Sequence, residues 1–170
     1  MTQLKRGVVG GITVLVAVSL SLSAQAAQKK RISATYTGTR VVSRTTVPLK
    51  DVPNHEIFQF VAMTETTSSD PDFNQLQGLI YGQGDQVAFT GSGNGYVILF
   101  QKDGAEIYIS FEGTGTAITK EGAIVGTTKE NKLRFIGGTG KFKNIKGTGT
   151  AKGRETEEGS TGDLEAEVEY

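Results

Sequence analysis

The sequence predicts an all-β domain, and the arrangement that fits best is a closed antiparallel β-barrel of about eight strands. One observation is composition, because the chain has 23 Gly, only 3 Pro and no Trp, with few helical periods. Another is a series of roughly eight to ten short β-branched and aromatic runs separated by turn residues. A two-sheet sandwich is the alternative, but closure is favoured because no strand has the features of a protected edge.

The first 26 residues resemble a secretory signal peptide. Lys5 and Arg6 form a basic start, residues 8–22 are mostly apolar, and residues 24–26 form a small-x-small cleavage site. A transmembrane anchor is the alternative, but the apolar run is short for a span of about 20 residues. We therefore expect export to the periplasm or the medium, with residues 27–170 as a single domain and no stable membrane anchor after cleavage.

Charge and cysteine content exclude several classes of protein. The chain has 18 Lys+Arg and 18 Asp+Glu, so removing Lys5 and Arg6 leaves a net charge of −2. This balance argues against nucleic acid or an anionic membrane surface as the partner. The absence of cysteine excludes disulfides, a thiol nucleophile and a zinc site of the Cys/His type.

The first half of the domain contains several expected strands. Residues 31–47 and 56–66 are rich in β-branched and aromatic residues, with a turn at 51–54 between them and a polar loop at 68–75 after them. Residues 78–81 and 86–90 are expected to flank a hairpin turn at 82–85. The glycines of residues 91–95 are expected to break the chain again.

The clearest hairpin joins residues 96–101 to 105–113 through Asp103-Gly104, a favoured turn pair. In its second arm, Ile107, Ile109 and Phe111 share one face. Glu106, Tyr108, Ser110 and Glu112 share the other face.

The remaining expected strands are residues 123–128, 132–136, 148–156 and 164–170, with a polar turn at 157–163. The last strand alternates apolar residues with glutamates, which predicts one buried face and one solvent-exposed face. Residues 113–117 and 147–151 repeat the sequence Gly-Thr-Gly-Thr-Ala, and we expect their glycines to lie on one face of each strand.

Residues 133–150 are predicted to form a corner between two strands. Three glycines, Gly137, Gly138 and Gly140, supply backbone freedom for a sharp bend. Phe142 and Ile145 lie three residues apart, which predicts a short helical turn that plugs the space under the corner. The next strand begins at Gly147.

This stretch, Gly-Gly-Thr-Gly-Lys-Phe followed by Gly-Thr-Gly-Thr, resembles the signature of the allene oxide cyclase and dirigent protein barrels. The resemblance is specific over residues 133–150, looser over 78–113 and not detectable before residue 76. It implies an exported bacterial-type member with a calycin-like eight-stranded barrel and a hydrophobic cavity, assembled as a homo-oligomer, either a trimer or a dimer. The plant cyclases close an unstable fatty-acid epoxide, and dirigent proteins steer radical coupling; both kinds work without a cofactor.

No motif in the sequence indicates a metal or a cofactor. His55 is the single histidine, and its polar surroundings predict a solvent-exposed turn residue. Asp70, Asp72 and Asn74 resemble the opening of a calcium loop, but Gln75 stands where glycine is needed and Tyr81 where the closing glutamate is needed.

The remaining place for chemistry is a pocket inside the barrel. We expect Tyr81, Phe100, Tyr108 and Phe111 to line it, with Tyr108 or Glu112 steadying developing charge. Strict alternation puts Tyr108 and Glu112 on the face opposite Phe111, so these assignments are compatible only if a bulge intervenes near Gly113. The other carboxylates weighed for this role are Glu65, Asp85, Glu106 and Glu130.

Three functions remain open from the sequence. The first is an exported barrel that binds a small apolar molecule, acting either as a cofactor-free isomerase or cyclase or as a dirigent-like chaperone of a reactive intermediate. The second is a non-catalytic envelope scaffold or interaction protein with a filled barrel. The third and least favoured is an outer-membrane barrel, because the glutamates of the last strand lie opposite its apolar row.

The signal-peptide assignment predicts a mature protein that begins directly after Ala26. Intact mass spectrometry of material secreted or released from the periplasm should give the mass of residues 27–170. A product that starts at Met1 in that fraction would contradict the assignment.

Overall fold

The computed structural model describes residues 29–170, so the expected signal peptide and its cleavage site lie outside the described residues. Eight strands follow one another, with one short 3₁₀ helix: β1 Lys29–Pro48, β2 His55–Ser68, β3 Leu76–Val87, β4 Thr90–Phe100, β5 Glu106–Lys120, β6 Ala123–Gly138, η1 Gly140–Phe142, β7 Lys146–Thr156 and β8 Gly159–Glu169. In this part of the chain, no helix is long and apolar enough to cross a membrane.

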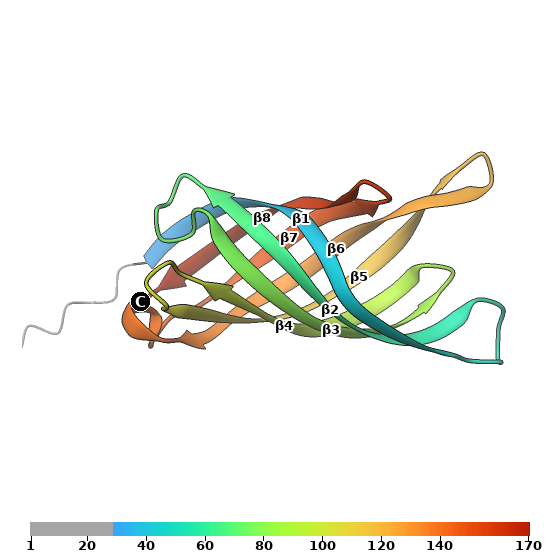
Figure 1. The fold of residues 1–170 in the computed structure, drawn as a ribbon, viewed down its shortest axis with the longest axis horizontal. Helices are drawn as coiled ribbons and strands as arrows, with labels where there is room; N and C mark the ends of the chain where they lie inside the picture. Colours follow the sequence, from blue (N-terminus) through green and yellow to red (C-terminus); the bar gives the residue numbers. More distant parts are fainter. Residues whose placement is uncertain (1–28) are drawn as a thin grey trace, which may run out of the picture.

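Each strand pairs antiparallel with the next, and β8 pairs with β1, which closes the sheet into a barrel (Figure 1). The predicted all-β closed barrel of about eight strands is confirmed. At one end, which we call the plug end, lie η1, the C-terminus and the connections β2–β3, β4–β5 and β6–β7. At the other, open end, long hairpins extend past the barrel body (Figure 1).

Two of the expected chain breaks are wrong. Residues 82–85 and 91–95 lie inside β3 and β4, and the β3–β4 turn is made by Ala88 and Phe89, both with positive φ (48° and 64°). These glycines occupy the inward rows without bending the chain: a Cβ atom at Gly82 would meet the Phe60 ring, and one at Gly91 or Gly93 would meet the backbone of β3. Similarly, residues 123–128 and 132–136 form one continuous strand, β6.

The predicted alternation of faces is confirmed in β5 and β8. Ile107 and Ile109 are buried, whereas Glu112 is exposed. In β8, Ala166 and Val168 are buried between outward-facing glutamates. The predicted glycine faces are also present, because the paired glycines of β5 and β7 occupy the inward row.

The predicted corner is confirmed as a 3₁₀ turn that plugs one end of the barrel. Phe142 and Ile145 are fully buried beneath it. Gly140 has a positive φ of 56°. A Cβ atom at Gly138 would lie 2.3 Å from the carbonyl oxygen of Glu106, so no side chain fits there.

The polar loop between β2 and β3 contributes more to this end than its sequence suggested. Phe73 from this loop is buried and packs edge-on against Phe142, with 6.2 Å between ring centroids. The Tyr170 ring also packs against Phe142, tilted by 54° with 5.0 Å between centroids, and its hydroxyl donates to Asp72 at 2.7 Å. The Lys141 ammonium pairs with the same carboxyl group and holds its pKa below the ordinary value.

The plug predicts a large stability effect at Phe142. Substitution Phe142→Ala should lower the free energy of unfolding by about 3–5 kcal/mol, because a fully buried ring leaves a cavity behind. Gly138→Val should cost about 1–3 kcal/mol because its side chain meets the Glu106 carbonyl. Urea unfolding measures both, with Phe89→Ala as the control because that ring is 50% exposed. Costs below about 0.5 kcal/mol for both plug variants would mean that the corner is an ordinary loop.

Candidate ligand-binding cavity

The half of the barrel beyond the plug is not filled by side chains. It holds a cavity of about 470 Å³ that reaches the open end. Its lining is drawn from the inward rows of all eight strands; the apolar members include Phe58, Phe60, Ala62, Ile80, Val97, Leu99, Ile109, Phe111, Leu133 and Leu164. A volume in this range suits a small organic ligand.

Glycines on one strand make room for aromatic rings on the next. Phe60 lies directly opposite Gly82, where a Cβ atom would be 2.2 Å from a Phe60 ring carbon. Phe58 lies opposite Gly84 in the same way, with a corresponding distance of 2.6 Å. The rings therefore lie along the wall, which keeps the centre of the barrel open.

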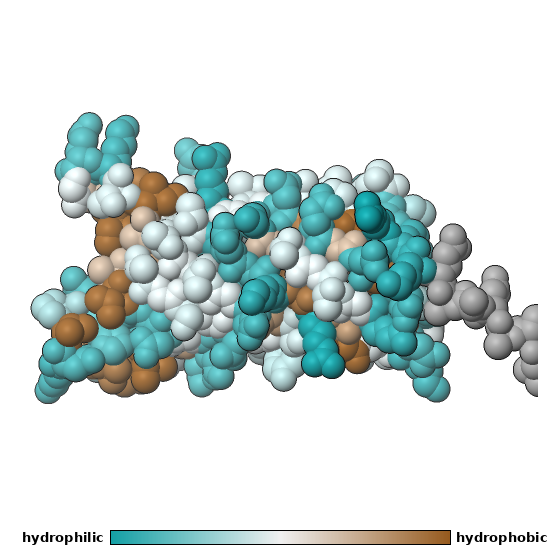
Figure 2. All heavy atoms as spheres, turned by 180° about the vertical axis from the view of Figure 1, so that it is seen from behind, coloured by the Kyte–Doolittle hydropathy of each residue, from teal (hydrophilic) through white to brown (hydrophobic). Residues whose placement is uncertain are grey.

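The open end of the cavity has an apolar rim. Val41, Phe89, Ile124 and Val125 line the cavity mouth and are each 42–50% exposed to solvent. Figure 2 shows hydrophobic residues gathered at this end, at the left of the view. An apolar ligand would therefore meet apolar surface before it entered the barrel.

Charged side chains occur in two pairs near the mouth. The Arg44 guanidinium donates to Glu56 at 2.8 Å and lies 4.6 Å from the centre of the Phe58 ring. On the opposite side, Lys129 of β6 forms an ion pair with Glu155 of β7. Because each of these cations has a carboxylate partner, the two pairs add no net charge to the entrance, and the exposed Glu157 adds one carboxylate.

Of the residues predicted to line the pocket, only one lies in this cavity. Phe111 is part of the lining. Tyr81 and Phe100 are 45% and 37% exposed on the outer surface, so their placement inside the barrel was wrong. Both alternate with inward residues, and no bulge reverses the alternation.

Tyr108 and Glu112 also lie on the outer face of β5. The Tyr108 hydroxyl donates to Glu106 at 2.6 Å, and this hydrogen bond raises the pKa of the Tyr108 phenol. The register of β5 shifts between Tyr108 and Ile109, not near Gly113, and it does not turn either side chain inward. The two residues weighed for catalysis therefore do not reach the cavity.

The other weighed carboxylates lie outside the barrel as well. Glu65, Asp85 and Glu130 are exposed, and Glu106 is half-buried. His55 is less exposed than expected, since 14% of its side chain is accessible, because its ring lies between two carboxylates. It is 2.8 Å from Asp85 and 2.6 Å from Asp51, and these hydrogen bonds raise its pKa.

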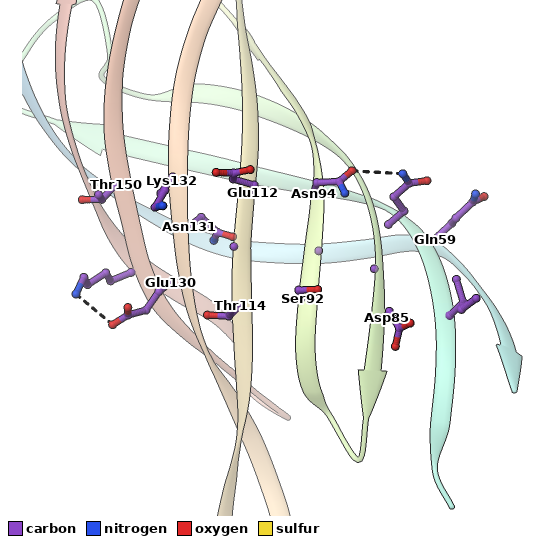
Figure 3. A pocket seen from close by; sticks show the side chains of 16 residues that line it. Gln59, Asp85, Ser92, Asn94, Glu112, Thr114, Glu130, Asn131, Lys132 and Thr150 are labelled. Carbon is purple, nitrogen blue, oxygen red and sulfur yellow. Dashed lines mark hydrogen bonds and ion pairs between the residues drawn. The ribbon is translucent and has the colours of Figure 1, made fainter. Parts of the chain in front are cut away.

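Glu112 instead borders a broad hollow on the outside of the barrel. The hollow is about 900 Å³ and runs across β2 to β7 (Figure 3). Its wall is polar: Gln83 donates to Asn94 at 3.3 Å, and Lys152 pairs with Glu130 at 3.1 Å, as the dashed lines in Figure 3 show. It is open to solvent and lacks apolar enclosure, so the interior cavity is the better candidate site.

The residues of the structure offer no candidate metal centre. Across residues 29–170, no group of three or more His, Cys, Asp or Glu side chains is placed to hold a metal ion. The 70–74 loop uses its side chains differently, since Asp70 pairs with Lys30 at 2.7 Å and Asn74 accepts from the Ser68 backbone.

No protein-family model matches the sequence, and no curated protein matches it. Among solved structures, the chain is similar to a pterocarpan synthase dirigent protein, with 12% identity, a TM-score of 0.49 and coverage of 94% of this chain and 99% of that chain.

It is also similar to a conserved protein of unknown function from Rhodopseudomonas palustris, with 11% identity, a TM-score of 0.47 and coverage of 83% and 97%. A third similar structure is a protein of unknown function from Clostridium acetobutylicum, with 12% identity, a TM-score of 0.48 and coverage of 84% and 99%. At these values the likeness does not identify a family, and the barrel rests on the chain's own strand pairing.

Several polar cavity residues were missed from the sequence, among them Tyr36, Lys129, Glu155 and Ser160. For two of them a local signal exists. Lys129 has the same parity as buried Leu133 and Phe135 on β6, and Glu155 has the parity of buried Ala151 on β7. Because alternate residues of a strand share a face, the buried apolar residues of each strand would have predicted that both side chains point inward.

The packing of Phe60 on Gly82 predicts a coupled pair of substitutions. Gly82→Ala should destabilise the protein by about 1–3 kcal/mol, because the new methyl group displaces the ring. In a Phe60→Ala background the same change should be neutral or stabilising, since the nearest contacts of that Cβ are all Phe60 ring atoms. Urea unfolding of the four proteins measures the coupling. Equal effects of Gly82→Ala in both backgrounds would contradict this packing.

Proposed function

We propose that the domain is an exported barrel that binds a small hydrophobic molecule in its interior cavity. The observation that supports this most directly is the cavity itself, about 470 Å³, closed by the plug at one end and reached through an apolar rim at the other. Concave sites with mostly apolar walls and a few polar groups are typical of small-molecule binding.

The lining supports an apolar ligand over a polar or charged one. Phe58, Phe60 and Phe111 present ring surface to the cavity, and the two charged pairs near the mouth are internally neutralised. Burying apolar ligand surface here would contribute roughly 25 cal/mol per Å² removed from water. The corner at residues 133–150 resembles that of the allene oxide cyclase and dirigent barrels, which is consistent with this class of ligand.

If the bound molecule is reactive, the same cavity can control its reaction without a cofactor. A fixed shape restricts the conformations of an intermediate and shields it from water, so that one ring closure or one coupling geometry is favoured. Such a cofactor-free isomerase or cyclase, or a dirigent-like chaperone, needs only the walls and a small number of positioned polar groups.

The alternative of a scaffold with a filled barrel has less support. It requires side chains to occupy the whole interior, as they do at the plug end around Phe142 and Phe135. Beyond that end the inward rows contain glycines, and the interior is open.

The proposal predicts that protein purified from its own host contains a bound apolar molecule. Native mass spectrometry should show this mass on the wild type and on Ile98→Trp, whose side chain lies on the outer face of β4. It should be absent from Val97→Trp, because the adjacent side chain points into the cavity and the indole would fill it. Near-ultraviolet circular dichroism checks that both variants fold. A wild type without ligand, or equal occupancy in both variants, would contradict the proposal.

A further inference from the structure

The Tyr36 side chain extends from β1 into the cavity and lies over two glycines of neighbouring strands. It pairs with Gly162 of β8, and Gly162 pairs in turn with Gly153 of β7. A Cβ atom would lie 2.4 Å from the Tyr36 hydroxyl oxygen at Gly162 and 2.1 Å from it at Gly153. Backbone carbonyls crowd these positions as well, but only at glycines can the phenol lie against the wall.

The Tyr36 hydroxyl is an uncommitted donor. Among the residues that the structure describes, it makes no hydrogen bond, and its oxygen stays accessible from the cavity. Tyr108 and Tyr170 differ, because their hydroxyls donate to Glu106 and Asp72. Tyr81 and Tyr96 are exposed on the outer surface, where water is available. Since a largely buried phenol normally finds a partner, the free hydroxyl indicates an acceptor that enters with the ligand.

The wall around Tyr36 contains side chains that can form hydrogen bonds. Ser160 is buried on the inward row of β8, two residues from Gly162, and Glu155 lies opposite Ser160 on β7. Glu155 is itself paired with Lys129. The facing wall, from β2 to β5, presents Phe58, Phe60, Val97 and Phe111. The phenylalanine rings that line the cavity therefore gather on the side opposite Tyr36 and Ser160.

We propose that the Tyr36 hydroxyl donates a hydrogen bond to the ligand, and that the ligand is a neutral apolar molecule with an oxygen acceptor such as a ketone, ester or ether. This inference rests on the proposed function and adds the chemical class of the ligand. The acceptor faces β8, where the Ser160 hydroxyl is a second donor, and the hydrocarbon part lies against the aromatic wall.

The electrostatics of the site agree with a neutral ligand. Burial, and then the negative charges of Asp163 and Glu155, raise the pKa of Tyr36. The phenol therefore stays protonated, and able to donate, at neutral and mildly alkaline pH. The Lys129 ammonium of this wall is already paired with Glu155, so it does not offer an unpaired cation to a carboxylate ligand.

Two probes of nearly equal shape test the proposal: the hydrocarbon fluorene and its ketone, fluorenone. Their dissociation constants are measured for the wild type and for Tyr36→Phe, with Tyr108→Phe as the matched control on the outer wall. The affinity ratio of ketone to hydrocarbon should fall about three- to tenfold in Tyr36→Phe, as expected for one lost hydrogen bond. It should not change in Tyr108→Phe, and Ser160→Ala should lower it to a smaller extent.

The possible results separate the two proposals. If both probes bind and the ratio is unchanged in Tyr36→Phe, the Tyr36 inference is overturned while the binding cavity stands. If neither probe binds the wild type, the proposed function fails and this inference fails with it. The infrared carbonyl stretch of fluorenone bound to the wild type gives a measurement that needs no variant. A band at the frequency found in hexane, without the shift to lower frequency that a hydrogen bond causes, would also overturn the inference.

Discussion

The cavity depends on cross-strand pairs of an aromatic residue and a glycine. Four inward rings lie opposite a glycine on a neighbouring strand: Phe58 with Gly84, Phe60 with Gly82, Phe111 with Gly95 and Tyr36 with Gly162. An eight-stranded barrel has an interior only just wide enough for its own side chains. Rings that extend along the wall over glycines occupy less of the centre than rings that point across it.

The two ends of the barrel use this limited interior differently. At the plug end the inward rows contain Ile107, Phe135 and Val168, and Phe142 and Phe73 close the barrel from below. Most of the fully buried apolar surface lies there, and that burial stabilises the fold. The open half can therefore hold a cavity, because the stability of the barrel comes mainly from the other half.

The sequence predicted the features that depend on neighbouring residues along the chain. Alternation in residues 106–112 and 164–170 identified the inward faces, and the glycines before Phe142 identified the corner. The glycines of residues 82–85 and 91–95 were mistaken for turns, because glycine also occurs inside a strand where another side chain needs room. Gly82 serves Phe60, and that relation appears only once β2 and β3 are paired.

The same limit explains the errors at the site. Tyr81 and Phe100 were chosen for residue type, although each directly follows a residue of its own strand that lines the cavity, Ile80 on β3 and Leu99 on β4, and so lies on the opposite face. The parity of Lys129 and Glu155 was available, but Tyr36 is different. A register shift follows Tyr36 in β1, between Thr37 and Arg40. The space that its hydroxyl occupies depends on Gly153 and Gly162, more than 110 residues later in the chain. No local pattern reports such a contact.

Two separate constraints explain why positions that face the barrel interior are glycine. At Gly95, the atom nearest to an added Cβ is the Tyr81 carbonyl oxygen, at 1.9 Å, so the close approach of the strands excludes any side chain. At Gly82, the three nearest atoms all belong to the Phe60 ring, the closest at 2.2 Å, so the facing side chain is the first obstacle to a larger residue. Strand geometry alone therefore accounts for part of the open space. The rest depends on which aromatic residue faces each glycine, so the shape of the cavity can change while the barrel is kept.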